Sequence, residues 1–487
     1  MSKKLFDGLK DFSTTTRTEN LAKTYTTSLN HNLDLFALGG ALRTRRTDEV
    51  LSLFTKAYSE NPLLAMKNLF YIRDIRGGMG ERKTFRTIIN YIANTPYSDT
   101  LLKNIHNIPE FGRWDDLYSL VDTKIESKMF EFMIDQAVED VTAENPSLLG
   151  KWLKSENTSS KESKRLARKT RLAFELTHTE YRQLLSSLRK RIGIIERLMC
   201  ANKWGDIEYD KITSKAGMIY RKAFHKHDGD RYREYLDAVE KGEKKINVRT
   251  LFPYEILRIA WRENDRTADL QWANLPNYLP EGENAIAVVD TSGSMTGLGF
   301  SRTVEPILIA LSLGIYFAER STGYFKNHFI TFSAQPQLQE IIGSTLHEKA
   351  QNLSRAHWQM NTNLQAVFSL ILTKAVQNNL KQEDIPDKIY IISDMEFDSC
   401  CYGSRDVTNF EKAKLKFNEF GYKLPTLVFW NVESRQDNIP VRFDEKGVVL
   451  VSGASPSIFK MMESGTLDPL SFMLFVLNTD RYISVKI

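Results

Sequence analysis

The sequence predicts an α plus α/β protein, with an all-helical repeat part over residues 1–275 and a doubly wound, mostly parallel sheet over residues 284–487. In the first part, apolar residues recur every three or four positions, which is typical of amphipathic helices. After Pro280, short runs of β-branched and aromatic residues alternate with helical patterns, which indicates a parallel sheet covered on both faces. A chain of 487 residues is also too long for one hydrophobic core.

The helical pattern is clearest where Leu184, Leu188, Ile192, Ile195 and Met199 form one apolar stripe. Short segments rich in glycine, proline or asparagine separate such stripes, as in "RGGMG" and "ENPS". Helices joined by short turns pack as stacked pairs. We therefore expect a HEAT-like helical repeat, either open or closed into a ring.

Five strands are predicted in the second part, at residues 285–290, 328–333, 388–394, 425–430 and 447–452. Helical patterns at residues 303–319, 363–378, 408–418 and 456–463 separate most of them. In sheets of this kind, ligands bind beyond the carboxyl ends of the strands. The polar residues of "VVDTSGSM" (288–295) and "YIISD" (390–394) lie at those ends.

The strongest motif is formed by Asp290, Ser292 and Ser294, which follow the first predicted strand. Thr362 at the start of a helix and Asp394 at the end of another strand would add two further oxygen ligands. Hard oxygen ligands suit a divalent cation, with Mg²⁺ expected and Mn²⁺ as the alternative. A polar turn without a metal ion is the competing interpretation.

Catalysis is not indicated. Phosphotransferases with an aspartate nucleophile usually have a second aspartate two residues on, where this chain has Ser292, and "TSGSM" is not the nucleophile elbow of a serine hydrolase. The stretch "RGGMGERKT" (76–84) has Arg82 where a nucleotide-binding loop needs glycine before its lysine. We therefore expect a protein that is not an enzyme, with a metal-dependent hydrolase as a minor alternative.

Basic residues are unevenly distributed along the chain. Residues 1–280 hold 47 Lys/Arg against 38 Asp/Glu, residues 281–487 hold 19 against 23, and residues 151–227 hold 19 against 8. A basic excess with interleaved aromatic residues is typical of RNA-binding proteins, although solvated helix faces are the alternative. The glycines of "RGGMG" would also let a phosphate approach the nearby arginines. The candidate RNA-binding residues are Arg76, Arg82, Lys83, Lys161, Lys164, Arg165, Arg168, Lys169, Arg171, Arg189, Lys190, Arg191, Arg221, Lys222 and Lys226.

The composition predicts a cytoplasmic protein. Three cysteines, of which Cys400 and Cys401 are adjacent, lack zinc-finger spacing and indicate a reducing compartment. The N-terminal stretch "MSKKLFDGLKDF" lacks the apolar core of a signal peptide. The longest apolar run, Pro306 to Ala318, is shorter than the roughly 20 residues that a membrane span needs. We expect a monomer without a membrane segment.

The order Asp290-x-Ser292-x-Ser294, Thr362, Asp394 resembles the metal-ion-dependent adhesion site of von Willebrand factor A domains. This resemblance covers residues 284–487. It implies that the hydroxyls and the aspartates bind the ion directly or through water. It also implies one open coordination position for the carboxylate of a protein partner.

A helical repeat followed by such a domain resembles the architecture of the Ro autoantigen (TROVE) family. Five phrases resemble more closely the domain-of-unknown-function 2828 family, over nearly the whole chain: "RGGMGERK", "FGRWDDL" (111–117), "SLLGKWLKSEN" (147–157), "YRQLLSSLR" (181–189) and "NTNLQAVF". The Ro resemblance implies a ring of helices that binds single-stranded RNA ends and small structured RNAs, with the metal domain closing the ring.

These resemblances and the basic segment together predict a component of a ribonucleoprotein. We expect it to hold small non-coding or misfolded RNA through the helical part, mostly by phosphate contacts. The metal site would bind a partner's carboxylate or rigidify the sheet edge. The alternative is a metal-dependent adaptor between proteins that binds no nucleic acid.

Overall fold

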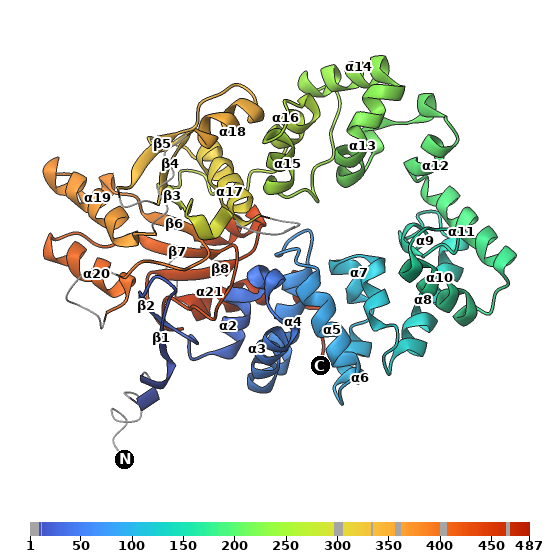
Figure 1. Ribbon diagram of the computed structural model, residues 1–487, viewed down its shortest axis with the longest axis horizontal. Coiled ribbons are helices and arrows are strands. Elements are labelled where there is room, and N and C mark those ends of the chain that lie inside the picture. Colours follow the sequence, from blue (N-terminus) through green and yellow to red (C-terminus); the bar gives the residue numbers. More distant parts are fainter. Residues whose placement is uncertain are drawn as a thin grey trace.

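The computed structural model describes residues 9–10, 12–296, 305–332, 335–355, 362–399, 407–463 and 468–487. Helices bend through a wide arc whose two ends rest on a sheet built from the second half of the chain (Figure 1). The predicted division into a helical part and a mostly parallel sheet is confirmed. Within the described ranges, no helix is both long enough and apolar enough to cross a membrane. Cys400 and Cys401 lie outside the described residues.

Helices of the arc begin and end at the short glycine-, proline- and asparagine-rich segments, as predicted. Asn61 caps α4 by accepting from Leu64 N (3.1 Å), and Gly193 ends α11 with φ +68°. This glycine also divides the predicted stripe from Leu184 to Met199 between two helices, because an αL residue cannot continue a helix. The helices are α2 (His31–Leu38), α3 (Thr47–Glu60), α4 (Pro62–Arg73), α5 (Lys83–Ala93), α6 (Ser98–Lys103), α7 (Asn107–Phe111), α8 (Glu126–Thr142), α9 (Leu149–Trp152), α10 (Lys161–Ala173), α11 (His178–Ile192), α12 (Ile195–Cys200), α13 (Ser214–His227), α14 (Gly229–Glu240), α15 (Pro253–Ala260) and α16 (Arg266–Ala273).

The sheet contains all five predicted strands in the order β5-β4-β3-β6-β7-β8, and every pair except β4 with β5 is parallel. The strands are β3 (Ala285–Val289), β4 (His328–Thr331), β5 (Gln337–Glu340), β6 (Lys388–Ser393), β7 (Thr426–Asn431) and β8 (Val448–Ser452). The antiparallel edge strand β5 was not predicted. Its sequence is polar and largely exposed, so it lacks the apolar signal of the other strands.

Helices cover both faces of the sheet. The described helices are α17 (Pro306–Arg320), α18 (Leu346–Ser354), α19 (Leu364–Gln377), α20 (Asn409–Glu419) and α21 (Pro469–Leu477), and the predicted helix at 456–463 is a 3₁₀ helix, η7 (Pro456–Glu463). On one face, Phe317 of α17 packs on Tyr390 with ring centroids 4.9 Å apart. Figure 1 shows α19 and α20 on the opposite side of the sheet.

The N-terminal segment packs on the sheet part, and the C-terminal residues pack on the helical arc. The N-terminal segment forms an antiparallel hairpin, β1 (Thr15–Arg17) and β2 (Lys23–Tyr25), so the prediction that residues 1–275 are all helical is wrong there. This hairpin is threonine-rich and has no apolar periodicity. Near the C-terminus, Asn104 Nδ2 donates to Lys486 O (2.7 Å). One continuous hydrophobic core therefore runs through the sheet and most of the arc, while helices α12 to α14 share a smaller core.

The arc closes. Phe252, just before α15, packs against Gly80, in the loop between α4 and α5. At the same end of the arc, α15 packs on α17 of the sheet part, while α2 at the other end packs on β8. The helices and the sheet together therefore form a closed ring rather than an open solenoid (Figure 1).

Candidate functional site

The carboxyl ends of β3 and β6 lie side by side, because Val289 pairs with Ile392 in parallel register. Asp290 follows β3, and Asp394 follows β6. Both side chains are buried. The sheet therefore brings together the two predicted aspartate ligands, as ligand sites at the carboxyl ends of parallel strands require.

The two predicted serine ligands complete a turn after Asp290. Ser292 N donates to Asp290 Oδ1 (2.9 Å), and the hydroxyl oxygens of Ser292 and Ser294 are 2.9 Å apart. Ser294 also hydrogen-bonds to Asp394, and Ser393 Oγ donates to Asp290 Oδ2 (2.5 Å). Four of the five predicted metal ligands thus belong to one hydrogen-bond network.

Burial raises the pKa of both Asp290 and Asp394, so their charged forms are disfavoured. Burial, together with the charge of Asp394, raises the pKa of Asp290 to about 7. Burial also raises the pKa of Asp394, although the guanidinium of Arg435, whose Nη2 donates to Asp394 Oδ2 at 3.0 Å, opposes the rise. Such a pair is stabilised by a nearby cation.

Thr362, the fifth predicted ligand, lies at the edge of this network. Its hydroxyl oxygen is 2.8 Å from Glu396 O and 3.0 Å from Asp398 Oδ1, and it accepts from Asn20 Nδ2 at 2.9 Å. Among the described residues it makes no hydrogen bond to the other four predicted ligands. It is joined to them through the loop that follows Asp394.

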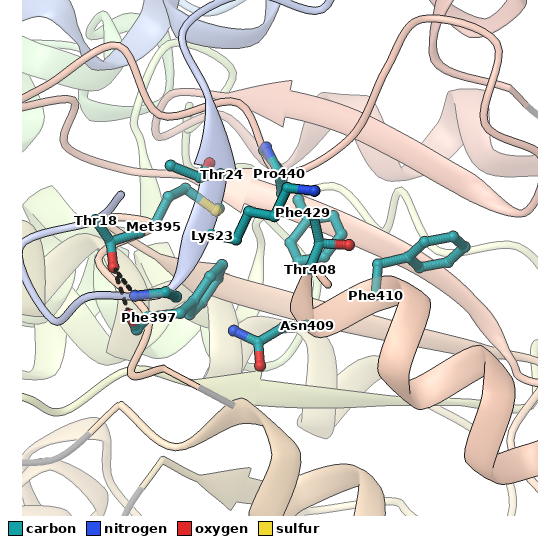
Figure 2. Close-up of a pocket in the computed structure, with 11 residues that line it drawn as sticks. Thr18, Lys23, Thr24, Met395, Phe397, Thr408, Asn409, Phe410, Phe429 and Pro440 are labelled. Atoms are coloured by element: carbon teal, nitrogen blue, oxygen red, sulfur yellow. Dashed lines mark hydrogen bonds between the residues drawn. The ribbon is translucent and has the colours of Figure 1, made fainter. Parts of the chain in front are cut away.

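The N-terminal hairpin covers that loop. Asn20 Nδ2 donates to Glu396 O (2.7 Å), and Glu19 N donates to Glu396 Oε2 (2.7 Å). Thr18 Oγ1 donates to Phe397 O (2.6 Å), a contact drawn in Figure 2 beside a small pocket between the hairpin and the sheet. The loop after β6 is therefore fixed by a segment that lies 377 residues away in sequence.

Four residues of this site were missed by the sequence analysis: Glu19, Asn20, Glu396 and Arg435. Burial, with the charge of Asp394, raises the pKa of Glu396 to about 7, and Glu19 pairs with Arg435 at 2.9 Å. Glu396 follows Asp394 at the same spacing at which Ser292 follows Asp290, and that repetition could have identified it. The other three come from distant segments and carry no local signal.

The donor set fits a hard divalent cation, since it combines the carboxylates of Asp290 and Asp394 with the hydroxyls of Ser292 and Ser294. In the described part of the chain, no three His, Cys, Asp or Glu side chains gather as a metal site, so the hydroxyls are needed to complete the ligand set. Arg435 already neutralises part of the charge on Asp394, which weakens the attraction of the site for a cation.

Most of the predicted RNA-binding residues make contacts within the protein. On α10, Arg165 pairs with Asp122 (2.6 Å), and Lys169 pairs with Asp122 (2.5 Å) and Glu126 (2.9 Å), so this face of α10 is tied to the start of α8. The other members with internal partners are Arg76, Lys83, Arg171, Arg189, Arg191, Arg221 and Lys222.

A second group of predicted RNA-binding residues is exposed, and within the described ranges their side chains have neither an ion pair nor a hydrogen bond. They lie on the outer helices α10, α11 and α13 and just before α5. These residues are Arg82, Lys161, Lys164, Arg168, Lys190 and Lys226.

The aromatic residues between these cations are also of two kinds, fully buried and half-buried. Tyr181 and Phe224 are buried in the two cores. Trp204 is half-buried and stacks on the exposed His227 with ring centroids 4.4 Å apart. Trp152 is half-buried beneath the guanidinium of Arg113, which lies 4.2 Å from the ring centroid.

Residues 18–171 and 149–281 match the family described as Domain of unknown function (DUF2828), and these two overlapping segments span more than half of the chain. The chain belongs to the DUF2828 family. In this DUF2828 protein, the match covers strand β2 of the N-terminal hairpin and the helical arc, which confirms the family predicted from the sequence phrases.

The sheet part matches a second family, Domain of unknown function (DUF7788), over residues 284–471. The DUF2828 match therefore stops before the sheet instead of extending over nearly the whole chain. The DUF2828 protein is also similar to "Uncharacterized protein L728" of Acanthamoeba polyphaga mimivirus, with 29% identity over 506 residues. That alignment covers 94% of this chain and 86% of the relative, so both proteins combine the two parts.

Proposed function

We propose that this protein is a non-enzymatic RNA-binding protein of Ro-like architecture. In this proposal, the helical arc holds small non-coding or misfolded RNA, and the sheet part is a von Willebrand factor A domain with a Mg²⁺ site. The protein contacts RNA mostly at its phosphates. It acts in the cytoplasm.

The observation that carries the proposal is the group of exposed cations on α10 and α11 that have no partner among the residues that the structure describes. Lys161, Lys164 and Arg168 project from one helix whose other cations, Arg165, Lys169 and Arg171, form ion pairs with Asp122, Glu126, Glu162 and Glu156. A helix with three cations in ion pairs and three in solvent has a residual positive charge on its outer face. Such a surface attracts a polyanion without selecting its sequence.

The closed arc supports the Ro-like part of the proposal. Its ends meet where Phe252 packs on Gly80, and the sheet part bridges α2 and α15. A closed ring keeps the basic helices in fixed positions relative to one another. A bound RNA would therefore meet a preorganised surface, which reduces the entropy cost of binding.

The sheet part contributes the proposed metal site. Asp290, Asp394, Ser292 and Ser294 would hold Mg²⁺, with Mn²⁺ as the alternative ion. When bound, the ion supplies a positive charge that attracts the carboxylate of a partner protein or rigidifies the loops at the sheet edge.

Fluorescence anisotropy with a labelled single-stranded RNA tests the RNA-binding function. Reversing three charges with Lys161→Glu, Lys164→Glu and Arg168→Glu should weaken binding by about tenfold or more, because each lost phosphate contact also reduces the counterion release. The control variant carries Lys326→Glu, Lys423→Glu and Lys460→Glu, exposed positions of the sheet part with the same total change in charge.

The two variants also distinguish site-directed binding from general charge attraction. Equal losses in both would show that only net charge matters. A wild-type protein that ignores RNA at low salt would remove this function and favour the alternative, a metal-dependent adaptor, for which the buried carboxylate pair Asp290 and Asp394 is the supporting feature.

A further inference from the structure

Three of the sequence phrases that mark the family meet at one place on the arc. Arg82 and Arg86 come from "RGGMGERK" and the start of α5, Arg113 comes from "FGRWDDL", and Lys154 follows α9 in "SLLGKWLKSEN". Arg86 and Arg113 both contact Asp115 (2.9 Å each), and Arg113 stacks on Trp152, two residues before Lys154. The charge of Arg82 acts on both Arg113 and Lys154, which places it beside them. We call Arg82, Arg86, Arg113 and Lys154 the cationic cluster.

Two carboxylates, Asp115 and Asp116, contact the arginines of the cationic cluster but are too few to neutralise its total charge. Asp116 accepts from Arg73 Nε (2.8 Å) and Arg86 Nε (2.6 Å). Asp115 accepts from Arg113 at both of its oxygens (2.9 and 3.0 Å) and pairs with Arg86 (2.9 Å). Three arginines therefore share two carboxylates.

The two remaining cations have no such partner. Neither Arg82 nor Lys154 has a carboxylate within 4.0 Å in the described part of the chain. Five cations, counting Arg73, thus face two anions, which leaves three positive charges at one location. Burial, with the repulsion of its neighbours, lowers the pKa of Lys154, and burial lowers that of Arg113.

The cluster is held rigidly. Arg113 is fixed by its two-pronged contact with Asp115 and by stacking on Trp152, 4.2 Å from the ring centroid. The backbone of Lys154 is fixed from both sides, because its N–H donates to Tyr118 Oη (3.2 Å) and its carbonyl accepts from Tyr181 Oη (2.7 Å). The side chains therefore stay close together despite their mutual repulsion.

The segment before Lys154 is fixed as well. Arg189 of α11 donates to Gly150 O (3.1 Å) and Leu153 O (2.9 Å). Arg189 was predicted to contact RNA, and the structure places it instead as a support for this segment. Cations that a fold packs together, partly desolvated and in excess of the carboxylates beside them, form a preorganised site for an anion.

We propose that the cationic cluster binds the terminal phosphate of an RNA strand, an inference that rests on the proposed RNA-binding function. Guanidinium and ammonium groups recognise phosphate oxygens by charge-assisted hydrogen bonds. A terminal phosphate carries about −1.5 to −2 charges at neutral pH, whereas an internal phosphodiester carries one. The excess of three positive charges matches the terminal group better.

Binding of two RNA oligonucleotides of the same sequence, one with a terminal phosphate and one with a terminal hydroxyl, tests this proposal. Anisotropy with the full-length protein should show about tenfold tighter binding of the phosphorylated strand. Lys154→Gln should remove this preference and leave the affinity for the hydroxyl strand unchanged, and Arg82→Gln should also remove the preference. Lys128→Gln on neighbouring α8, an exposed residue paired with Glu131, should keep the preference.

The outcomes separate this site from the general RNA surface. Equal affinity for the two strands in the wild type overturns the proposal, even where Lys161→Glu, Lys164→Glu and Arg168→Glu still weaken both. Inorganic phosphate provides a second probe. If it raises the melting temperature of the wild type but not of Lys154→Gln, while the two strands bind equally, the cluster binds a free phosphate and the assignment to an RNA end is wrong.

Folding controls are provided by the same variants. Because Lys154→Gln and Arg82→Gln remove repulsion without removing an ion pair, their melting temperatures should equal or exceed that of the wild type. A variant that melts at a lower temperature and loses affinity for both strands would assign these residues a structural role and contradict the proposal.

Discussion

The aromatic ring of Phe252 lies so close to the α-carbon of Gly80 that a β-carbon added there would be 2.3 Å from Phe252 Cζ. Because this contact joins the two ends of the arc, we expect Gly80→Ala to open the ring and to destabilise the protein. The left-handed conformation of Gly80 costs an alanine about 1–2 kcal/mol, and the clash with Phe252 adds about 1–3 kcal/mol.

The matched control is Gly193→Ala. Gly193 has nearly the same φ (+68° against +70°), but beyond its two chain neighbours no atom of the described ranges lies within 4 Å of an added β-carbon. The stability lost in Gly193→Ala therefore measures only the cost of placing an alanine in a left-handed backbone conformation. Chemical denaturation of both variants measures the difference, and equal losses would show that the Phe252 contact contributes nothing.

The second prediction concerns the buried ion pair between Arg73 and Asp116, whose Nε and Oδ2 are 2.8 Å apart. Asp116→Asn leaves Arg73 without a carboxylate and should cost about 3–5 kcal/mol. Arg73→Met should cost less, because Asp116 keeps its contact with Arg86 at 2.6 Å. The free energy of unfolding of each variant tests this order, and a larger loss for Arg73→Met would contradict it.

The third prediction concerns Mg²⁺. An ion that binds only the folded protein stabilises it by about 1.4 kcal/mol at ten times its dissociation constant, so the melting temperature should rise with Mg²⁺ concentration. Asp290→Asn should abolish this rise by removing a ligand charge. Glu340→Gln, an exposed change on strand β5 of the same sheet, should leave it intact. A Mg²⁺ response that survives Asp290→Asn would place the ion elsewhere.

The fourth prediction concerns His31 at the start of α2. The carboxylate of Asp34, whose Oδ2 lies 3.5 Å from His31 Nδ1 and accepts its hydrogen bond, raises the pKa of this histidine above 6.5. A raised pKa means that the protonated form favours folding. The contribution is complete below pH 6.5 and is lost as the pH rises through the folded-state pKa.

Melting curves at pH 5.5 and 8.5 test this sign. The wild type should lose more stability than His31→Gln on going to the higher pH. A histidine NMR titration of the wild type provides an independent measurement, and a His31 pKa at or below 6.5 would contradict the assignment.

The elements that the sequence predicted best are those whose side chains are buried on one face or on all faces. Strands β3 and β6 were found within one residue of their predicted ends, because their residues are almost all apolar. The hairpin β1–β2 was missed, because its threonines are stabilised by partners such as Ile439 that lie hundreds of residues away. The residue pattern of a short segment does not indicate which distant strand it pairs with.

The metal site was predictable to the extent that sheet topology determines it. Asp290 and Asp394 follow neighbouring parallel strands, so their proximity follows from strand order. Arg435 could not be assigned in the same way, because it lies in the loop after β7, and only its side-chain conformation brings it to Asp394. Among the basic residues, sequence could not separate Arg165, which packs against α8, from Lys164, which is exposed.

Helix α2 packs on β8, and the amide of Gly40, just beyond α2, donates to the hydroxyl of Ser452, 412 residues further along the chain. During synthesis on the ribosome at about 5–20 residues per second, α2 emerges roughly 20–80 s before β8 exists. Nearly every residue of α2 is buried in the finished protein. Helices α3 and α4 also pack on α2 and are translated soon after it, but the face of α2 that packs on β8 stays uncovered until the last strand of the sheet is made. This delay leaves apolar surface of the growing polypeptide exposed to aggregation.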